Sequence, residues 1–336
     1  LRYIGYFVVV YAFLSLYPQY RDSFIRVGVA GATLVVGFAM LQLVLPHDVL
    51  KYIGYSSATI KPYILLDDNP DYVRFNSTLR GPNPLGAYAM MVLLGVVAYG
   101  MVVGRTLKSQ SRKWLHAFLM LGGLTAMWVS YSRSAVIGLV AGLLALFASS
   151  FHGSIGRRQI VAVCLAIVSI GLIGYGLRDT DVFKNLVLHD NPLTGARLTS
   201  DQGHASSLAE GFRRMLDQPF GAGVGSTGSA SLAGDKPFII ENYYLMVAHE
   251  VGWVGVMLFM LIWGVLLRML WLKRTDWIAG IAFASGIGLA VIAITWPVLA
   301  DDTVSMIWWG WAAVALAPVI MTKGKKYGAT TNKKTT

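Results

Sequence analysis

Nine apolar segments, each close to the length that crosses a bilayer, follow one another along this 336-residue chain with mostly short polar connections. A transmembrane helix needs roughly 20 apolar residues to cross about 30 Å of hydrocarbon. A spanning segment must satisfy its own backbone hydrogen bonds there, as a helix does. The chain is therefore predicted to be an all-α, polytopic transmembrane helical bundle. The candidate spans are about 3–17, 24–45, 84–104, 114–130, 134–151, 159–177, 242–267, 277–297 and 303–321.

The charged residues support this class and predict its topology. They make up 13% of the chain, against about 25% in soluble domains. If the spans alternate in direction, one set of connections holds 16 basic and 2 acidic residues, and the other holds 12 basic and 14 acidic. Lys and Arg concentrate on the cytoplasmic side of membrane proteins. The net charge of +11 therefore indicates orientation in a lipid bilayer, and no nucleic-acid partner is expected.

This alternation predicts a multi-pass protein of the cell (cytoplasmic or inner) membrane with its two long loops, 46–83 and 178–241, on the extracytoplasmic side. The turn Ser130–Ser134 and the pair Asp301–Asp302 fall on the same side. The predicted units are six spans in 1–177, the loop 178–241, three spans in 242–322 and a basic cytoplasmic tail, 323–336.

Disulfides and metal sites find little support in the sequence. The single cysteine, Cys164, lies in a candidate span and has no partner. The acidic turn Asp67–Asp71 matches no calcium-loop template, so no metal is expected. Because the first candidate span is short and the chain begins with Leu1, we expect one or more further spans upstream.

The loop 178–241 is predicted to contain an amphipathic helix. Ser200 or Asp201 can cap it, and it runs through about Leu216. Such a helix suits the membrane surface or the end of the bundle. Its apolar face consists of Leu208, Phe212, Met215 and Leu216.

A glycine series follows this helix, beginning at Gly221 and Gly223. A dinucleotide-binding fingerprint needs a preceding strand and a following helix, and a polar helix precedes the glycines instead. A flexible backbone that admits a bulky substrate is the interpretation we prefer.

Three arginines, Arg74, Arg80 and Arg133, are predicted to lie at the extracytoplasmic rim. Arginine can fork onto phosphate oxygens and stays charged, so together they favour an anionic ligand. Singly, each could snorkel to headgroups or cap a helix end. Arg213 and Arg214 of the loop helix are further candidates.

His204 and Glu241 are the candidate acid–base pair. A carboxylate or imidazole at a dry rim can take a proton from an attacking hydroxyl. The alternative for Glu241, with Asn242 after it, is a cap on the next span. His249 and Glu250, two turns further on, are either functional or paired within the bundle.

These residues resemble the O-antigen ligase and O-antigen polymerase superfamily of bacterial glycan-assembly membrane proteins. The resemblance covers roughly 74–267 and departs from the ligases at two positions: Glu241 stands where they have His, and His204 stands about where many members have Arg. Four patterns carry it in order: Arg74 through Gly86 with its Arg-Gly-Pro-Asn-Pro core around Asn83, Ser132-Arg133-Ser134, Pro219 through Gly225, and Glu241-Asn242 followed after nine residues by Gly252-Trp253-Val254-Gly255.

The resemblance implies an inverting, metal-independent glycosyltransferase without a cofactor. Its partners would be a glycan on polyprenyl (undecaprenyl) diphosphate and a glycan or lipid-linked acceptor whose hydroxyl attacks. Arg80 and Arg133 would hold the diphosphate, with Arg74 secondary, and Glu241, with or without His204, would deprotonate the acceptor. The substrate loop would comprise Asn83, Gly221, Gly223 and Asn242.

Two other classes remain open at this point. A transporter or flippase of the same lipid-linked glycans would be expected to show internal repeats and broken helices at mid-membrane. The sequence shows no repeat, and its polar residues gather at one rim. The third class is a non-catalytic scaffold for polysaccharide assembly.

Overall fold

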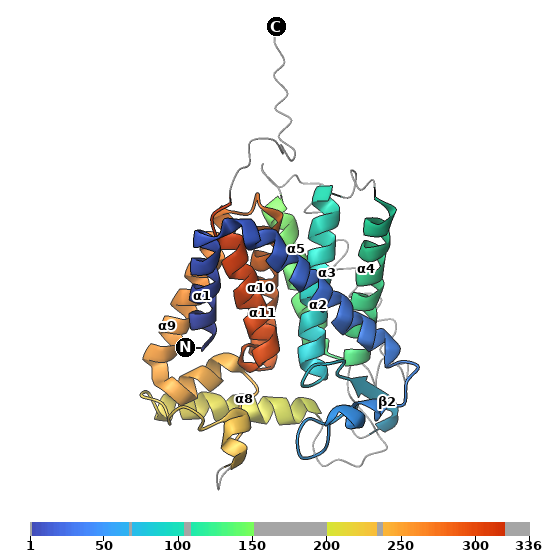
Figure 1. The fold of residues 1–336 in the computed structure, drawn as a ribbon. Coiled ribbons are helices and arrows are strands. Elements are labelled where there is room, and N and C mark those ends of the chain that lie inside the picture. The colour runs from blue at the N-terminus through green and yellow to red at the C-terminus, as the bar shows by residue number, and fades with distance from the viewer. Residues whose placement is uncertain (1, 67–68, 104–108, 151–199, 234–237, 320–336) are drawn as a thin grey trace, which may run out of the picture.

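The computed structural model describes residues 2–66, 69–103, 109–150, 200–233 and 238–319 (Figure 1). This part of the chain is predominantly helical, as predicted. Four of its helices are long and apolar enough to cross a membrane, which indicates a membrane protein. These four are Pro18–Leu41, Pro82–Val102, Tyr243–Leu272 and Trp277–Thr295.

Most described helices coincide with candidate spans, and the candidate at 159–177 lies outside the described residues. The helices are α1 (Arg2–Leu16), α2 (Arg21–Leu41), α3 (Pro82–Val103), α4 (Gln110–Ser130), α5 (Arg133–Ser150), α8 (Ser200–Asp217), α9 (Tyr243–Leu272), α10 (Trp277–Thr295) and α11 (Asp302–Leu316). Short 3₁₀ segments are Pro18–Tyr20, Val49–Ile53, Gly228–Ala233 and Val298–Ala300.

Small residues bring α5 and α10 together at the centre of the bundle. A Cβ added to Gly138 of α5 would lie 3.0 Å from the carbonyl oxygen of Gly288 in α10, and one added to Gly142 would lie 3.1 Å from that of Ala284. Membrane helices approach closely through such residues because lipid provides no hydrophobic drive for their association. The apolar sequence of α10 is thus explained by burial within the bundle.

Aromatic rings pack α11 against α9 and α10. Trp308 of α11 stacks on Trp263 of α9 with ring centroids 3.9 Å apart, and its indole N–H donates to the carbonyl of Ala282 at 2.9 Å. A fully buried indole is favourable when its N–H finds a partner, so Trp308 fixes the C-terminal helix in the core.

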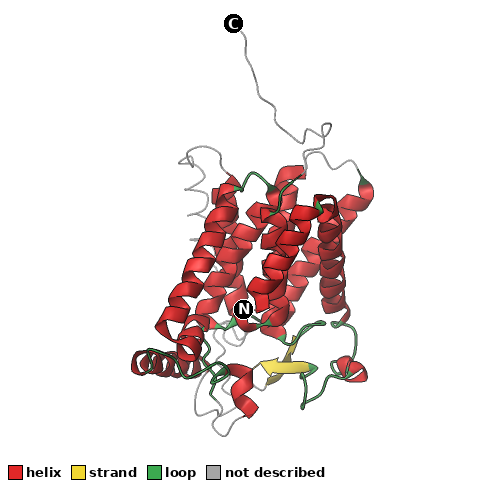
Figure 2. Cartoon of the chain, turned by 60° about the vertical axis from the view of Figure 1, so that its left-hand side comes forward, coloured by secondary structure: helices red, strands yellow, loops and turns green. Residues whose placement is uncertain are grey.

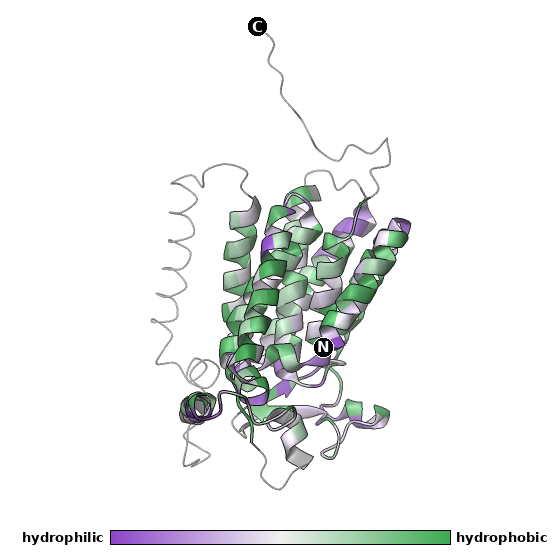
Figure 3. Ribbon diagram, turned by 90° about the vertical axis from the view of Figure 1, so that its left-hand side faces the viewer, coloured by the Kyte–Doolittle hydropathy of each residue, from purple (hydrophilic) through white to green (hydrophobic). Residues whose placement is uncertain are grey.

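Hydrophilic residues gather at the two ends of this apolar bundle (Figure 3). Every described ion pair joins two residues that span alternation assigns to the same end. Arg21 pairs with Asp276 at one end, while Arg2 and Arg80 pair with Asp302 at the other. Each of these long-range ion pairs therefore stays within one end of the bundle.

The loop 46–83 is more ordered than the all-α prediction allowed. It contains an antiparallel hairpin of β1 (Tyr63–Leu66) and β2 (Asn69–Phe75), with Tyr63 opposite Phe75 and Ile64 opposite Arg74. Figure 2 shows the strands at the end of the bundle where α8 also lies. Alternating side chains on β2 place Arg74 against the helix ends.

The candidate span at 242–267 is also corrected by the structure. The helix α9 extends to Leu272 and is two helices joined across a kink, with Gly252 at φ 76° and ψ −176°. Other residues adopt this backbone conformation at a high cost in energy. The kink therefore separates a first stretch of α9, which includes His249 and Glu250, from the longer stretch that follows Gly252.

Candidate functional site

Arg74 connects the hairpin to the ends of two helices. Its Nε donates to the carbonyl of Ser130, the last residue of α4, at 2.9 Å. Its Nη2 donates to Oδ1 of Asn83, in the first turn of α3, at 2.6 Å. Arg74 and Asn83, two predicted site residues, are thus in direct contact. Because Arg74 donates to these two protein oxygens, it holds the end of α4 beside the start of α3. The bond to Asn83 fixes the orientation of the Arg74 guanidinium.

The turn that carries Arg133 is packed tightly against α3. Tyr131 adopts a left-handed conformation with φ 46°, and the Ser132 N–H donates to Oγ of Ser130 at 3.3 Å. A Cβ added to Gly86 of α3 would lie 2.8 Å from Cβ of Ser132. Arg133, the first residue of α5, directly follows this turn and is partly exposed. It therefore lies three residues beyond Ser130, whose carbonyl accepts from Arg74.

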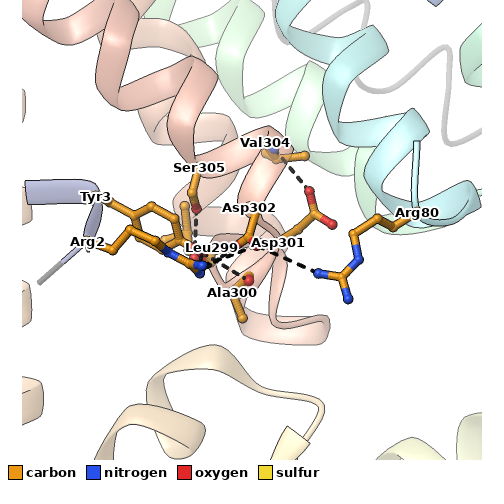
Figure 4. Close-up of polar contacts among 9 residues, drawn as sticks. All are labelled: Arg2, Tyr3, Arg80, Leu299, Ala300, Asp301, Asp302, Val304 and Ser305. Atoms are coloured by element: carbon orange, nitrogen blue, oxygen red, sulfur yellow. Dashed lines mark hydrogen bonds and ion pairs between the residues drawn. The ribbon is translucent and has the colours of Figure 1, made fainter. Parts of the chain in front are cut away.

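Arg80 reaches from the start of α3 toward the start of α11 (Figure 4). Its Nη1 lies 3.9 Å from Oδ2 of Asp302, and 53% of its side chain is exposed. Asp302 is held more closely by Arg2 and by the Tyr3 hydroxyl, which donates at 2.7 Å. An exposed ion pair of this length contributes little to stability, so the Arg80 guanidinium can exchange this partner for a ligand.

Asp301 lies beside this pair and is 9% exposed. Its Oδ1 caps α11 by accepting the N–H of Val304 at 3.0 Å. Burial raises the pKa of Asp301, while the hydrogen bond from Val304 and the charge of Arg80 oppose that shift. The rim therefore contains a buried carboxyl whose ionised form is disfavoured by desolvation and favoured by Arg80.

We predict that Asp301→Asn is at least as stable as the wild type at neutral pH, whereas Asp301→Ala loses about 1 kcal/mol. Asn keeps the capping oxygen and removes a charge that burial disfavours. Thermal unfolding in detergent, followed by tryptophan fluorescence, measures both. Lowering the pH toward the raised pKa of Asp301 should protonate the wild type and bring its stability toward that of Asp301→Asn. An Asn variant as unstable as the Ala variant would contradict the prediction.

Arg213 and Arg214 do not extend this cluster. Both donate to Glu210 on the same helix, Arg213 at 2.9 Å and Arg214 at 2.7 Å. The hydrogen bonds from Arg213 and then Arg214 lower the pKa of Glu210 to about 2. Arg214 also lies over the ring of Phe238, 4.1 Å from its centroid. The two predicted ligands are thus engaged with the helix and its neighbours.

Asn242 is the cap that the sequence offered as an alternative. Its Oδ1 accepts the N–H of Leu245 at 2.9 Å, and its Nδ2 donates to the carbonyl of Ile294 at 2.8 Å. Both polar groups of Asn242 therefore serve the fold. The neighbouring Glu241 is partly exposed, and the described structure gives the capping role to Asn242.

The helix α8 packs beside Glu241. The Glu241 N–H donates to Oγ of Ser207 at 3.3 Å, and a Cβ added to Gly211 would lie 3.2 Å from Cγ2 of Ile240. His204 lies on the same helix, one turn before Ser207. The structure thus brings the backbone of this turn near Glu241, which the sequence left open.

The loop Pro219–Gly225, called the glycine loop below, packs closely against the kink of α9. A Cβ added to Gly221 would lie 2.7 Å from the carbonyl oxygen of Glu250, and one added to Gly252 would lie 2.5 Å from that of Pro219. An added Cβ at Gly223 would meet no atom of the described residues within 4 Å. Three backbone hydrogen bonds hold the loop against the kink. The N–H groups of Ala222, Gly223 and Trp253 donate to the carbonyls of His249, Glu250 and Pro219, respectively.

An open, apolar crevice of about 570 Å³ lies between α8 and the start of α9, next to Glu241. Its mostly apolar lining suits an alkyl or prenyl chain more than a sugar. The lining residues are Leu208, Ala209, Phe212, Asn242, Tyr244 and Leu245.

Sequence reasoning placed Asp301 and Asp302 at this end but gave them no role, and it missed Ser207. The acidic pair at the start of an apolar run was the available signal for a cap. Ser207 carried no comparable signal. Comparison of the sequence with models of protein families and with curated proteins finds no match.

Proposed function

We propose that this protein is a membrane glycosyltransferase that moves a glycan from a polyprenyl diphosphate carrier to an acceptor hydroxyl. The proposal includes about nine spans in the cell membrane and a reaction at the extracytoplasmic face. It is supported by the four motif resemblances and by the residues that meet at one end of the bundle.

The observation that carries the proposal is the half-exposed guanidinium of Arg80 beside the rim built by Arg74 and the Arg133 turn. A diphosphate leaves readily once its charge is neutralised, and preorganised cations at the site of developing charge are an effective way to achieve this. Arg80 and Arg133 are the proposed diphosphate ligands. Arg74 holds the turn in place rather than contacting the substrate.

Glu241 is the proposed general base. The acceptor hydroxyl gives its proton to the Glu241 carboxylate while its oxygen attacks the anomeric carbon of the glycan. The bond from that carbon to the phosphate oxygen breaks, and polyprenyl diphosphate leaves with the bonding pair. In-line attack inverts the anomeric configuration. The apolar crevice of α8 and α9 lies beside this position and would receive part of the prenyl chain.

Within the described residues, the kink in α9 is the observation that favours the alternative, a transporter or flippase of lipid-linked glycans. Transporters often bind substrate where helices are broken. Here, however, the backbone groups of His249, Glu250 and Trp253 at the break bond to the glycine loop. Since protein atoms occupy these groups, the break serves packing, and we prefer the enzyme.

The test is a reconstituted assay with a polyprenyl-diphosphate glycan and a glycan acceptor, scored for both transfer and flipping. We expect Arg80→Ala to lower the transfer rate by about 100-fold, the loss typical of removing one charge-stabilising donor. Unfolding temperature should change little, because the ion pair with Asp302 is exposed and long and Arg80 acts on the buried Asp301 through its charge alone.

Arg2→Ala is the matched control, since Arg2 pairs with the same carboxylate of Asp302 at the same end. It should keep wild-type transfer. Equal losses in Arg80→Ala and Arg2→Ala would assign both to the structure around Asp302. Flipping without transfer in the wild type would support the transporter instead.

A further inference from the structure

A cavity lies beneath α2, at the end of the bundle opposite the candidate site. Figure 1 shows α2 crossing the front of the bundle diagonally. It contacts α11 at Gly28, where an added Cβ would lie 2.5 Å from the indole of Trp311. It contacts α4 at Val36, whose Cγ2 would lie 2.7 Å from a Cβ added to Gly122. Between these contacts α2 covers a cavity of about 540 Å³. Ligand pockets commonly measure roughly 300–1,000 Å³.

The deep part of this cavity is apolar. It is lined by Val29 and Ala32 of α2, Val92 and Gly95 of α3, and Ile307 of α11. Gly95 leaves space there among the described residues, because Cδ1 of Ile281, at 3.9 Å, is the one described neighbour that an added Cβ would meet. A hydrocarbon chain is the ligand that suits this lining, since it loses nothing by leaving the lipid.

The mouth of the cavity carries two exposed guanidiniums, Arg26 of α2 and Arg112 of α4. Arg26 donates to Oγ of Ser23 at 3.1 Å. His116 is also at the mouth, as is one exposed acid, Asp22. The charge of the neighbouring Arg21 is neutralised by its ion pair with Asp276. Of the remaining charged lining residues, Arg26 and Arg112 are positive and Asp22 is negative, so the mouth is net positive.

An aromatic pair borders this basic mouth. The rings of Tyr99 and Trp277 meet edge to face with centroids 5.5 Å apart, and both line the cavity. Tyr and Trp favour the level of the lipid headgroups. The residues at the mouth are therefore of the types found at the membrane interface, and the residues deeper in the cavity are of the types that face hydrocarbon.

We propose that this cavity binds one anionic phospholipid, with its phosphate on Arg26 and Arg112 and one acyl chain along α3. Arginine forks match phosphate oxygens, and basic pockets between transmembrane helices on the cytoplasmic side bind acidic headgroups. The mouth is at the end that charge sorting assigns to the cytoplasm. The bound lipid fixes the crossing of α2 and is separate from any transfer reaction at the other end.

Native mass spectrometry of the full chain in detergent tests this, with phosphatidylglycerol and phosphatidylcholine of identical acyl chains as probes. The wild type should retain one phosphatidylglycerol. The double variant Arg26→Gln/Arg112→Gln should bind it about 25-fold more weakly, since each basic residue contributes about 1 kcal/mol near an acidic headgroup and about 1.4 kcal/mol is tenfold. Gly95→Leu should abolish retention by filling the apolar part, with helix content unchanged.

The matched control is Lys113→Gln/Arg268→Gln, which removes the same charge at the same end from exposed residues outside the cavity lining. It should bind as the wild type does. Equal retention of the two lipids, equal weakening by the control, or unchanged binding in Gly95→Leu would each overturn the proposal. So would displacement of the lipid by inorganic phosphate alone or by a polypeptide crosslinked within the cavity.

Discussion

Glu241→Gln is expected to lower the rate of glycan transfer by about 10²–10⁴-fold, the range that a general base contributes. The substitution keeps the size of the side chain and removes its ability to take a proton. The cap of α9 should survive because Oδ1 of Asn242 accepts the capping N–H. Loss of a negative charge near the helix start costs about 1 kcal/mol or less. Single-turnover transfer and thermal unfolding, measured on the same preparation, separate the two effects.

Glu250→Gln is the matched control for this experiment. Glu250 lies within α9, just beyond Glu241 along the chain, and its Oε1 accepts the N–H of Gly225 at 3.1 Å. Gln retains an acceptor oxygen for that bond, so we expect near-normal transfer. Full activity in Glu241→Gln together with a large loss in Glu250→Gln would assign the role of general base to Glu250, at the kink of α9, in place of Glu241. Loss of stability rather than rate in Glu241→Gln would return Glu241 to a structural role.

The helices were largely predictable because their signals are local. Apolar runs, a capping Asn or Asp, and small residues are all visible in sequence, and Asn242, Asp276 and Asp301 do accept the N–H bonds that start α9, α10 and α11. The hairpin was missed because its first strand, Tyr63–Leu66, has only 4 residues and because the second, Asn69–Phe75, begins with the residues Asn-Pro-Asp, which are typical of a turn. The polar composition of that segment indicated only a loop.

The candidate site was predictable in part. Topology placed Arg74, Arg80 and Arg133 at one end, and the structure agrees. The division of labour among them was not predictable, because the partners of Arg74, Ser130 and Asn83, come from two different helices. Arg213 and Arg214 were predicted as ligands from their charge alone.

The glycine loop shows most clearly what one sequence cannot reveal. Gly221 and Gly223 were interpreted as room for a substrate, yet Gly221 packs against the backbone at Gly252. Each glycine looks like a flexible position when considered alone. The need for glycine arises from the contact between Gly221 and Gly252, which depends on where the loop packs against the kinked helix.

Gly252→Ala is expected to destabilise the protein by at least about 3 kcal/mol, since a left-handed backbone and a steric clash act together. The residue has φ 76° and ψ −176°. Its new Cβ would lie 2.5 Å from the carbonyl oxygen of Pro219 and 2.7 Å from the carbonyl carbon of Phe220. These are backbone atoms that cannot move without breaking the bond from Trp253 to Pro219. Thermal unfolding and proteolysis of the loop are the measurements.

Gly221→Ala should behave like Gly252→Ala, because its Cβ would lie 2.7 Å from both the Glu250 carbonyl oxygen and the Gly252 nitrogen. Gly223→Ala is the control: φ is +102°, but in the part of the chain that the structure describes nothing lies within 4 Å of an added Cβ, so backbone strain alone should cost about 1–2 kcal/mol. Normal stability with impaired transfer in Gly221→Ala would restore the substrate role for that glycine. Equal destabilisation of all three would show that the left-handed backbone, and not the contact with α9, is what the loop requires.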